Sequence, residues 1–356
     1  MKDRISRLRK VLKDKNLGVA VITSRPNTLY FSGFSGSSSV IIVSAEEAYF
    51  ATDFRYIEHA RELCGEIMTV EMFNTSADEH MTGRINEMGI ATVGFEESDV
   101  SQGRYADWTA KMQGVAFAGI QSEVDTLRII KDDNEIKLIQ KAVDIADGAF
   151  SHILKYIKPG VREFEIAAEI EFYMRRNGAS APAFETIVAS GKRSSLPHGH
   201  SSGKVIEAGD PVTMDFGALV NGYCSDMTRT VFAGKPDDKM MDIYNVVLDA
   251  QMTSEKGVHA GRTGFEVDKI SRDIIYGAGY EGCYGHGLGH GVGIMVHESP
   301  RLSEKSTTML ENGMVVTVEP GIYVANYGGV RIEDMVVVHG KKPIVLTKST
   351  KEMIIL

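Results

Sequence analysis

The sequence predicts an α/β domain at the amino terminus, followed by a second domain built from helices and β-hairpins. Its length of 356 residues exceeds a single domain of about 150 residues. Short apolar runs typical of strands alternate with helical patterns over residues 1–125. Residues 126–356 instead begin with a long amphipathic helix and contain a weak internal repeat. These observations favour two domains, 1–125 and 126–356.

The composition excludes several classes of protein. The chain carries 39 Lys and Arg against 48 Asp and Glu, a net charge of −9 without basic blocks, which argues against nucleic-acid and anionic-membrane partners. Its three cysteines, Cys64, Cys224 and Cys283, form no CxxC pair, which argues against disulfides and a thiolate zinc site. The charged residues 1–16 do not resemble a signal peptide, and no apolar run is long enough for a membrane span. We therefore expect a cytoplasmic protein.

The first domain is predicted from apolar periodicity. Apolar residues at helical spacing from Ile5 to Leu12 predict a helix. Two further helical patterns cover Arg55–Leu63 and Gln102–Lys111. The predicted strands are Val19–Ile22, Val40–Val43, Ala48–Phe50, Ile67–Met72 and Thr92–Phe95.

The second domain is expected to begin within Ser122–Asp133. An amphipathic helix with apolar positions from Ile136 to Ile157 follows and ends at the breaker Lys158-Pro159-Gly160. Glu207–Gly217 aligns with Glu311–Gly321, and this alignment places Asp215 opposite Glu319. At nearly the same offset, Gly160, Phe164, Glu165 and Gly178 match Gly261, Phe265, Glu266 and Gly279. Each half would run helix, turn, helix, strand, hairpin, although chance similarity of two amphipathic stretches is the alternative.

A hairpin in the first half places two carboxylates together. Asn221-Gly222 between β-rich runs is typical of a two-residue type I′ turn. Residues whose numbers sum to 443 then face each other, so Asp226 lies opposite Gly217 and diagonal to Asp215. Burying such a pair is costly without a compensating positive charge, so they can grip a divalent cation. The alternative is a pair of solvated acids on an exposed edge.

A second hairpin repeats the arrangement. Two predicted strands, Val315–Val324 and Gly329–Val338, are joined by Ala325–Gly328, and a register centred on residue 326 sets Glu319 opposite Glu333. Because side chains alternate between faces, Asp334 points away from this pair and Arg331 shares its face. A salt-bridged surface pair is the alternative reading.

Histidines and glycines are concentrated between the two hairpins. The segment Tyr284–Pro300 contains His286, His290 and His297 among five glycines that allow close backbone approach. A phosphate-binding loop is disfavoured because the segment neither follows a clear strand nor opens a helix. His198, in LPHGH, precedes the first acidic hairpin.

Four carboxylates and one imidazole favour a site for divalent metal ions. Oxygen ligands with one nitrogen suit Mn²⁺, Co²⁺, Fe²⁺ or Zn²⁺, and bridging carboxylates would hold two ions about 3.5–4 Å apart. Such a pair activates water and polarises a carbonyl or phosphoryl oxygen. Metal-assisted hydrolysis is the reaction class that this predicts.

Residues 130–356 resemble the prolidase, aminopeptidase P and methionine aminopeptidase family. The resemblance is carried by LPHG, MDFGALVNGYCSDMTRT, GHGLGHGVG, VHESPRLS, TVEPGIY and GVRIEDMVVV. It implies the α+β pseudo-twofold "pita-bread" fold for the catalytic domain. The segments NTLYFSGFSGSS and ATDFRY are similar to the creatinase/prolidase amino-terminal domain, which methionine aminopeptidases lack. The Xaa-Pro branch and a homodimer are therefore expected.

The resemblance also implies roles for individual residues. The implied metal ligands are Asp215, Asp226, His290, Glu319 and Glu333. Asp226 and Glu333 would bridge two divalent ions, and Mn²⁺ is the preferred metal. The implied catalytic residues are His198 and His297 at the substrate, Glu319 as proton shuttle, and Arg331 near the site. Hydrolysis would proceed by attack of a metal-bridging hydroxide on the peptide carbonyl.

Two differences from the family pattern stand out. Leu288 occupies a position where Thr is frequent, and His200 matches no role and is expected at the surface. The leading hypothesis is an Xaa-Pro dipeptidase, with an Xaa-Pro aminopeptidase as the alternative. A creatinase-like metal-free hydrolase and a non-catalytic binding module are disfavoured because all five ligand positions carry metal-binding residues.

Overall fold

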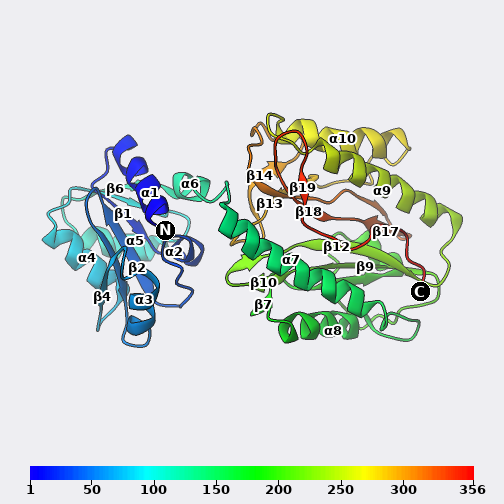
Figure 1. Cartoon of the computed structure of the whole chain (residues 1–356), viewed down its shortest axis with the longest axis horizontal. Coiled ribbons are helices and arrows are strands. Elements are labelled where there is room, and N and C mark those ends of the chain that lie inside the picture. Colours follow the sequence, from blue (N-terminus) through cyan, green and yellow to red (C-terminus); the bar gives the residue numbers. More distant parts are fainter. The chain divides into compact units, whose positions relative to one another are not determined.

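The computed structural model describes Met1–Leu356 and divides into two compact units, Met1–Arg128 and Ile129–Leu356 (Figure 1). The division lies three residues beyond the expected one, between residues 125 and 126. The reason is that the buried guanidinium of Arg128 hydrogen-bonds to Asn27 and, at 2.9 Å, to Asp125, both in the first unit. None of the helices is long and apolar enough to cross a membrane.

The first unit is a mixed six-stranded sheet with helices, in the strand order β4-β3-β2-β1-β5-β6. Its strands are β1 (Val19–Ile22), β2 (Ser39–Ser44), β3 (Ala48–Thr52), β4 (Thr69–Met72), β5 (Thr92–Phe95) and β6 (Ala116–Gly119). Its helices are α1 (Lys2–Asp14), α2 (Arg25–Ser32), α3 (Ile57–Cys64), α4 (Ala77–Glu87), α5 (Gln102–Lys111) and α6 (Gln121–Thr126).

The α/β layout of this unit is confirmed, and each predicted strand and helix is present. Helix α3 begins two residues later than predicted, at Ile57, and β4 begins at Thr69. The elements α2, α4, α6 and β6 were not predicted. Helix α2 shows why, since it is a short helix capped by Ser24 and buries the polar residues Asn27 and Thr28, so it lacks an apolar stripe.

The second unit is an α+β structure, as predicted. Figure 1 shows α7 and α8 along one side of its strands and α9 and α10 along the other. The helices are α7 (Asp133–Ile153), α8 (Glu163–Arg176), α9 (Asp238–Gly257) and α10 (Gly264–Gly277), with a short 3₁₀ helix η1 (Gly191–Ser195). The strands of the first half are β7 (Ala181–Pro182), β8 (Ile187–Ser190), β9 (Asp210–Phe216), β10 (Ala218–Val220), β11 (Tyr223–Cys224) and β12 (Met227–Ala233). Those of the second half are β13 (Gly289–Gly291), β14 (Glu298–Leu302), β15 (Val315–Val318), β16 (Gly321–Val324), β17 (Gly328–Arg331), β18 (Asp334–Val337) and β19 (Ile344–Val345).

The internal repeat is confirmed by matching strand orders and loop contacts. The sheet order β12-β9-β8 in the first half corresponds to β18-β15-β13 in the second. Before the second helix of each half, an isolated bridge joins Arg162 to Val205 and, correspondingly, Thr263 to Met309. Gly160 and Gly261, with φ of 97° and 88°, occupy equivalent positions in the turns before α8 and α10. The two halves are therefore related structurally as well as in sequence.

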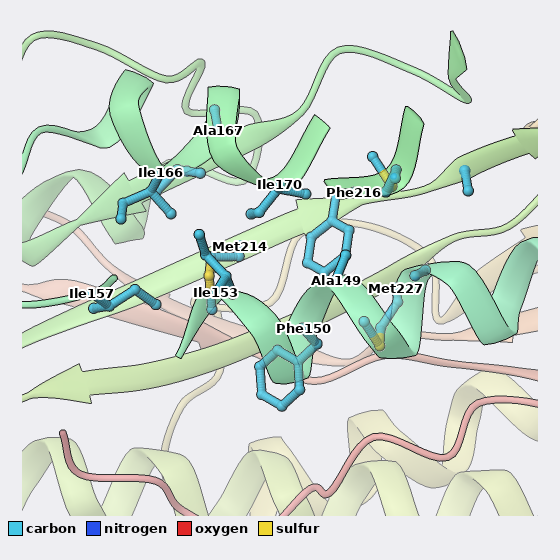
Figure 2. Packing of buried hydrophobic residues seen from close by; sticks show 14 of the residues in the cluster. Ala149, Phe150, Ile153, Ile157, Ile166, Ala167, Ile170, Met214, Phe216 and Met227 are labelled. Atoms are coloured by element: carbon cyan, nitrogen blue, oxygen red, sulfur yellow. The ribbon is translucent and has the colours of Figure 1, made fainter. Parts of the chain in front are cut away.

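The apolar faces of α7 and α8 pack on β9 and β12. Figure 2 shows Phe150 and Ile153 of α7 and Ile170 of α8 lying close to Met214 and Phe216 of β9. Burying each such side chain contributes about 1.5–3 kcal/mol. This packing gives the acid-bearing strands a rigid support.

Helix α7 ends at Ile153, four residues before the predicted end. The backbone N–H groups of Tyr156 and Ile157 both bond to the carbonyl of Ile153 and form a tight turn. Ile157 stays buried through this turn, so the apolar periodicity continues although the helix does not.

Candidate metal centre

The first acidic hairpin has the predicted register. Thr228 pairs with Asp215 and Val220 pairs with Tyr223, and each pair of numbers sums to 443. Asn221 and Gly222 have φ of 49° and 83°, as a type I′ turn requires. The ladder is interrupted between the pairs Phe216–Met227 and Leu219–Cys224, and only glycine fits at 217, where a Cβ would lie 1.8 Å from the carbonyl oxygen of Ser225. The neighbouring Asp226 is thus freed from the ladder.

The second acidic hairpin also keeps its predicted register, but it forms two ladders rather than one continuous strand pair. Gly321 pairs with Arg331 in one ladder, and Val318 pairs with Asp334 in the other. Pro320 has no N–H to continue the pairing. The backbone N–H of Glu333 instead bonds to the carbonyl of Thr228, at 3.1 Å, in the first hairpin. Glu319 and Glu333 therefore lie where the two hairpins meet.

His290 on β13 reaches the same position. Its Nδ1 lies 3.1 Å from the carbonyl oxygen of Gly291, which leaves Nε2 directed at the acids. Nε2 lies 3.3 Å from Oε1 of Glu319 and 3.6 Å from Oδ2 of Asp226. Ligand atoms of Asp226, His290 and Glu333 all lie within 4.8 Å of one another. These three residues are the core of a candidate metal centre.

A cavity of about 440 Å³ encloses the candidate centre. All of the residues named as ligand or catalytic candidates line it: His198, Asp215, Asp226, His290, His297, Glu319, Arg331 and Glu333. Its remaining walls include the apolar side chains Phe184, Ile187, Val296 and Leu302, together with Arg301. Such a mixture of apolar walls and convergent polar groups is typical of a small-molecule site.

Arg331 links the two hairpins. Its Nη2 bonds to Oδ2 of Asp215 at 2.6 Å, its Nε to Oγ1 of Thr228 at 3.0 Å, and its Nη1 to the Tyr323 hydroxyl at 3.0 Å. The same hydroxyl lies 2.8 Å from Nε2 of His286. His286 therefore lies at the edge of the cluster and contacts Tyr323 rather than the acids.

The carboxyl groups are electrostatically strained. Burial, followed by the charge of Glu333, raises the pKa of Asp226 well above its usual value. Burial and the charge of Glu319 do the same to the pKa of Glu333. Burial also raises the pKa of Asp215, against the opposing effect of Arg331. Burial acts in the same sense on Glu319, but the hydrogen bond and charge of His290 outweigh it and hold its pKa at about 2.

These residues fit a divalent metal ion. Oδ1 of Asp215 is buried without a hydrogen-bond partner, and Arg331 offsets only part of the negative charge of the four carboxyl groups, of which those of Asp226 and Glu333 are buried. A divalent cation would supply both a partner for that oxygen and the missing positive charge. The donor set of carboxylate oxygens and one imidazole is one that Mn²⁺ and its neighbours accept.

The two other candidate histidines lie beside this cluster. The ring of His297 packs edge-on against that of His290, with centroids 4.3 Å apart. Burial, and then His290, lower its pKa. His198 is an exposed residue and lines the cavity. His200, as expected, is a surface residue, and its ring lies 3.2 Å from Glu185.

Arg301 and Tyr323 were not singled out from the sequence. Arg301 lies within VHESPRLS, and Tyr323 lies four residues after Glu319, on the strand that continues from it. Alternation along that strand could have indicated Tyr323. Nothing local indicates Arg301, because its position depends on how β14 packs against the Gly-rich segment.

The fold and the cluster together define a metal-dependent hydrolase with an appended α/β domain. A family model described as "Metallopeptidase family M24" matches residues 137–340, and one described as "Creatinase/Prolidase N-terminal domain" matches residues 4–130. The chain belongs to metallopeptidase family M24. Members of this family are hydrolases that use divalent metal ions, and the donor set above agrees with this.

Relatives and solved structures cover nearly the whole chain. An uncharacterized peptidase of Bacillus subtilis is 45% identical over 99% of this chain and 100% of its own. The structure of an Xaa-Pro dipeptidase from Bacillus anthracis has a TM-score of 0.97 and 44% identity, covering 99% of each chain. The structure of an X-Pro aminopeptidase from Thermotoga maritima has a TM-score of 0.91 and 37% identity, covering 96% of this chain and 98% of that one.

Proposed function

We propose that the protein is a metal-dependent Xaa-Pro dipeptidase, a prolidase. The observation that carries this proposal is the cavity in which four carboxyl groups and one imidazole converge, in a chain of the M24 family. Prolidase structures similar over the whole chain support the same activity.

The proposed ligands are Asp215, Asp226, His290, Glu319 and Glu333. Divalent ions held there would make water a nucleophile at neutral pH and would polarise the scissile carbonyl. Glu319, whose pKa is lowered mainly by the hydrogen bond and charge of His290, is ionised at neutral pH and is proposed to accept a proton transiently from the attacking water. It would then deliver this proton to the leaving imino nitrogen of proline.

Two histidines are proposed to contact the substrate. The lowered pKa of His297 keeps its ring neutral at neutral pH, so an N–H can donate to the developing oxyanion. His198 lines the same cavity and is proposed to act with it. Arg331 is proposed to orient Asp215 through the bond of 2.6 Å.

Dipeptidase specificity is favoured by Arg301. Of the two arginines that line the cavity, Arg331 is engaged with Asp215, whereas Arg301 is exposed and has no ion pair. A free guanidinium suits the carboxylate of a dipeptide, which lies one residue beyond the scissile bond. In a longer peptide that carboxylate is an amide, and the contact is lost.

The activity is tested by assaying Ala-Pro and Ala-Pro-Ala with added Mn²⁺. We expect cleavage of Ala-Pro at least about tenfold faster in kcat/KM, because one charge-assisted contact contributes about 1.4 kcal/mol or more. In Arg301→Met this preference should fall to within about twofold, mainly through KM. Preferential cleavage of Ala-Pro-Ala would instead establish the aminopeptidase alternative, and no cleavage of either peptide would refute the proposal.

We also propose the identity of the metal, the oligomeric state and the cellular location. Mn²⁺ is proposed as the metal, ahead of Co²⁺, Fe²⁺ or Zn²⁺, because most of the donor atoms are oxygens. A homodimer is proposed from the match of the amino-terminal domain to its family, and sedimentation equilibrium measures it directly. A cytoplasmic location is supported by three free cysteines.

A further inference from the structure

A buried acid outside the cavity contacts both ends of the loop that carries His198. Glu163 is the first residue of α8, and its side chain is fully buried, although it does not line the cavity. A buried carboxylate is costly unless its oxygens are hydrogen-bonded. The hydrogen-bond partners of the Glu163 carboxylate therefore identify the segment that it holds in place.

All five hydrogen bonds to the Glu163 carboxylate come from the segment 190–202. Oε1 accepts from the backbone N–H of Ser190 at 2.7 Å and from its hydroxyl at 2.9 Å. Oε2 accepts from the backbone N–H of Ser202 at 3.1 Å, from its hydroxyl at 2.6 Å, and from Nε of Arg193 at 3.1 Å. One carboxylate thus joins the start of the loop to its end.

These five hydrogen bonds to Glu163, called the clamp below, act on His198 through the backbone of its loop. Arg193, held by Glu163, donates from Nη2 to the carbonyl of His200 at 2.5 Å. On the other side of His198, the carbonyl of Pro197 accepts from Nη1 of Arg331 at 3.2 Å. The imidazole of His198 itself makes no hydrogen bond, so the backbone of its loop sets its position.

The second half of the domain contains a similar device for its own histidine segment. Asp268 of α10 is also fully buried and accepts from the backbone N–H of Leu288 at 2.8 Å and from Nε of Arg272 at 2.6 Å. Arg272 in turn donates to the carbonyl of His286 at 2.7 Å. In the repeat, Glu163 matches Gly264 rather than Asp268. The two halves therefore reach the same arrangement, an acid and an arginine holding a histidine loop, from different positions.

We propose that Glu163 is a positioning residue for His198, acting with Arg193 from outside the cavity. The proposal rests on the proposed peptidase function. Because a displacement of about 1 Å of a reacting group can lower the rate about 100-fold, loosening this loop is expected to lower kcat. The metal ligands are held by other contacts and should remain in place.

The test compares Glu163→Gln and Arg193→Met with the matched control Glu165→Gln. Glu165 is exposed on the same first turn of α8, and its side chain bonds only within the helix cap. We expect Glu163→Gln to lower kcat on Ala-Pro about 10- to 100-fold, with KM and bound Mn²⁺ within about twofold of wild type. The Glu165→Gln control should match wild type, and Glu163→Asp should recover part of the rate.

A double-mutant cycle distinguishes positioning from a general structural role. In a His198→Ala background, Glu163→Gln should change kcat by less than about twofold, because the residue it positions is already gone. In a His297→Ala background it should retain its full effect. Equal losses in all three backgrounds would overturn the proposal.

Amide hydrogen exchange gives a readout that does not depend on activity. Glu163→Gln should accelerate exchange in peptides covering 190–202 and leave 284–291 unchanged, whereas Asp268→Asn should show the reverse. Unchanged exchange over 190–202 would contradict the clamp, whether or not the wild type cleaves Xaa-Pro peptides. If the exchange changes as expected but the wild type cleaves no Xaa-Pro peptide, only the proposed function fails. If Glu163→Gln does not fold, Arg193→Met, whose side chain is partly exposed, decides the same question.

Discussion

Individual side chains at the candidate centre have opposite electrostatic environments. Burial raises the pKa of both Asp226 and Glu333, with Glu333 adding to the shift of Asp226 and Glu319 to that of Glu333, whereas Glu319 is kept ionised by His290. Removing one carboxylate of the crowded pair relieves repulsion but also removes a donor atom. Metal binding and protein stability should therefore respond differently to the same substitution.

At this scale we predict the effect of Asp226→Ala. Activity should fall at least about 1,000-fold and bound metal should be lost, because a central donor is gone. The melting temperature of the metal-free variant should not fall below that of the metal-free wild type, since a strained buried acid has been removed. Kinetics, elemental analysis and calorimetry measure these effects. His200→Ala is the control and should match wild type; normal turnover in Asp226→Ala would refute the assignment.

At the scale of elements, tight turns and ladder interruptions bring the acids to one place. The turn at Asn221-Gly222 fixes the register of Asp215 and Asp226, and the gap at Gly217 lets Asp226 leave the ladder. The second hairpin uses Pro320 to interrupt its own ladder beside Glu319. Asp226, Glu319 and Glu333 thus lie where their ladders are interrupted, whereas Asp215 stays paired with Thr228.

The prediction for this scale concerns Gly222→Ala. Its φ of 83° lies where an L-residue costs about 1–2 kcal/mol, so urea unfolding should show a loss of that size. Metal affinity should fall as well, because the turn holds the first hairpin. The control is Gly277→Ala at the end of α10, where a Cβ meets nothing within 4 Å and φ is not positive. An unchanged free energy of unfolding in Gly222→Ala would contradict this account of the turn.

At the scale of the whole domain, stability and metal binding are linked through pH. Asp226 and Glu333 have higher pKa values in the folded than in the unfolded chain. Their contribution to the stability of the metal-free protein is therefore complete below the unfolded values of 3.8 and 4.5, and it is lost as pH rises through the folded values. Metal ions compete with the same protons, so binding should strengthen as pH rises.

We predict that Mn²⁺ raises the melting temperature of chelator-treated protein more at pH 8 than at pH 5. At a concentration of 100 times Kd the stabilisation should be about 2.7 kcal/mol. Scanning calorimetry at both pH values measures it, and Glu333→Ala should show no Mn²⁺-dependent rise. An equal or larger rise at pH 5 would show that these carboxyl groups do not carry the linkage.

The sequence by itself determined the local geometry of the hairpins. The Asn-Gly turn and the alternation of side chains gave the correct registers for Asp215 with Thr228 and for Glu319 with Glu333, because both depend on a few neighbouring residues. The separation of Asp334 from Glu333 follows from the same alternation, and Asp334 indeed pairs with Arg229 at 2.6 Å.

Only the tertiary structure decided which distant groups meet. The bond from Arg331 to Asp215, the place of Arg301 in the cavity wall and the clamp of Glu163 on the His198 loop join residues far apart in the chain. The end of α7 at Ile153 also depended on packing, since Ile157 is buried whether or not the helix continues. Local propensities do not specify such contacts, because they arise from how helices and sheets pack once their own geometry is set.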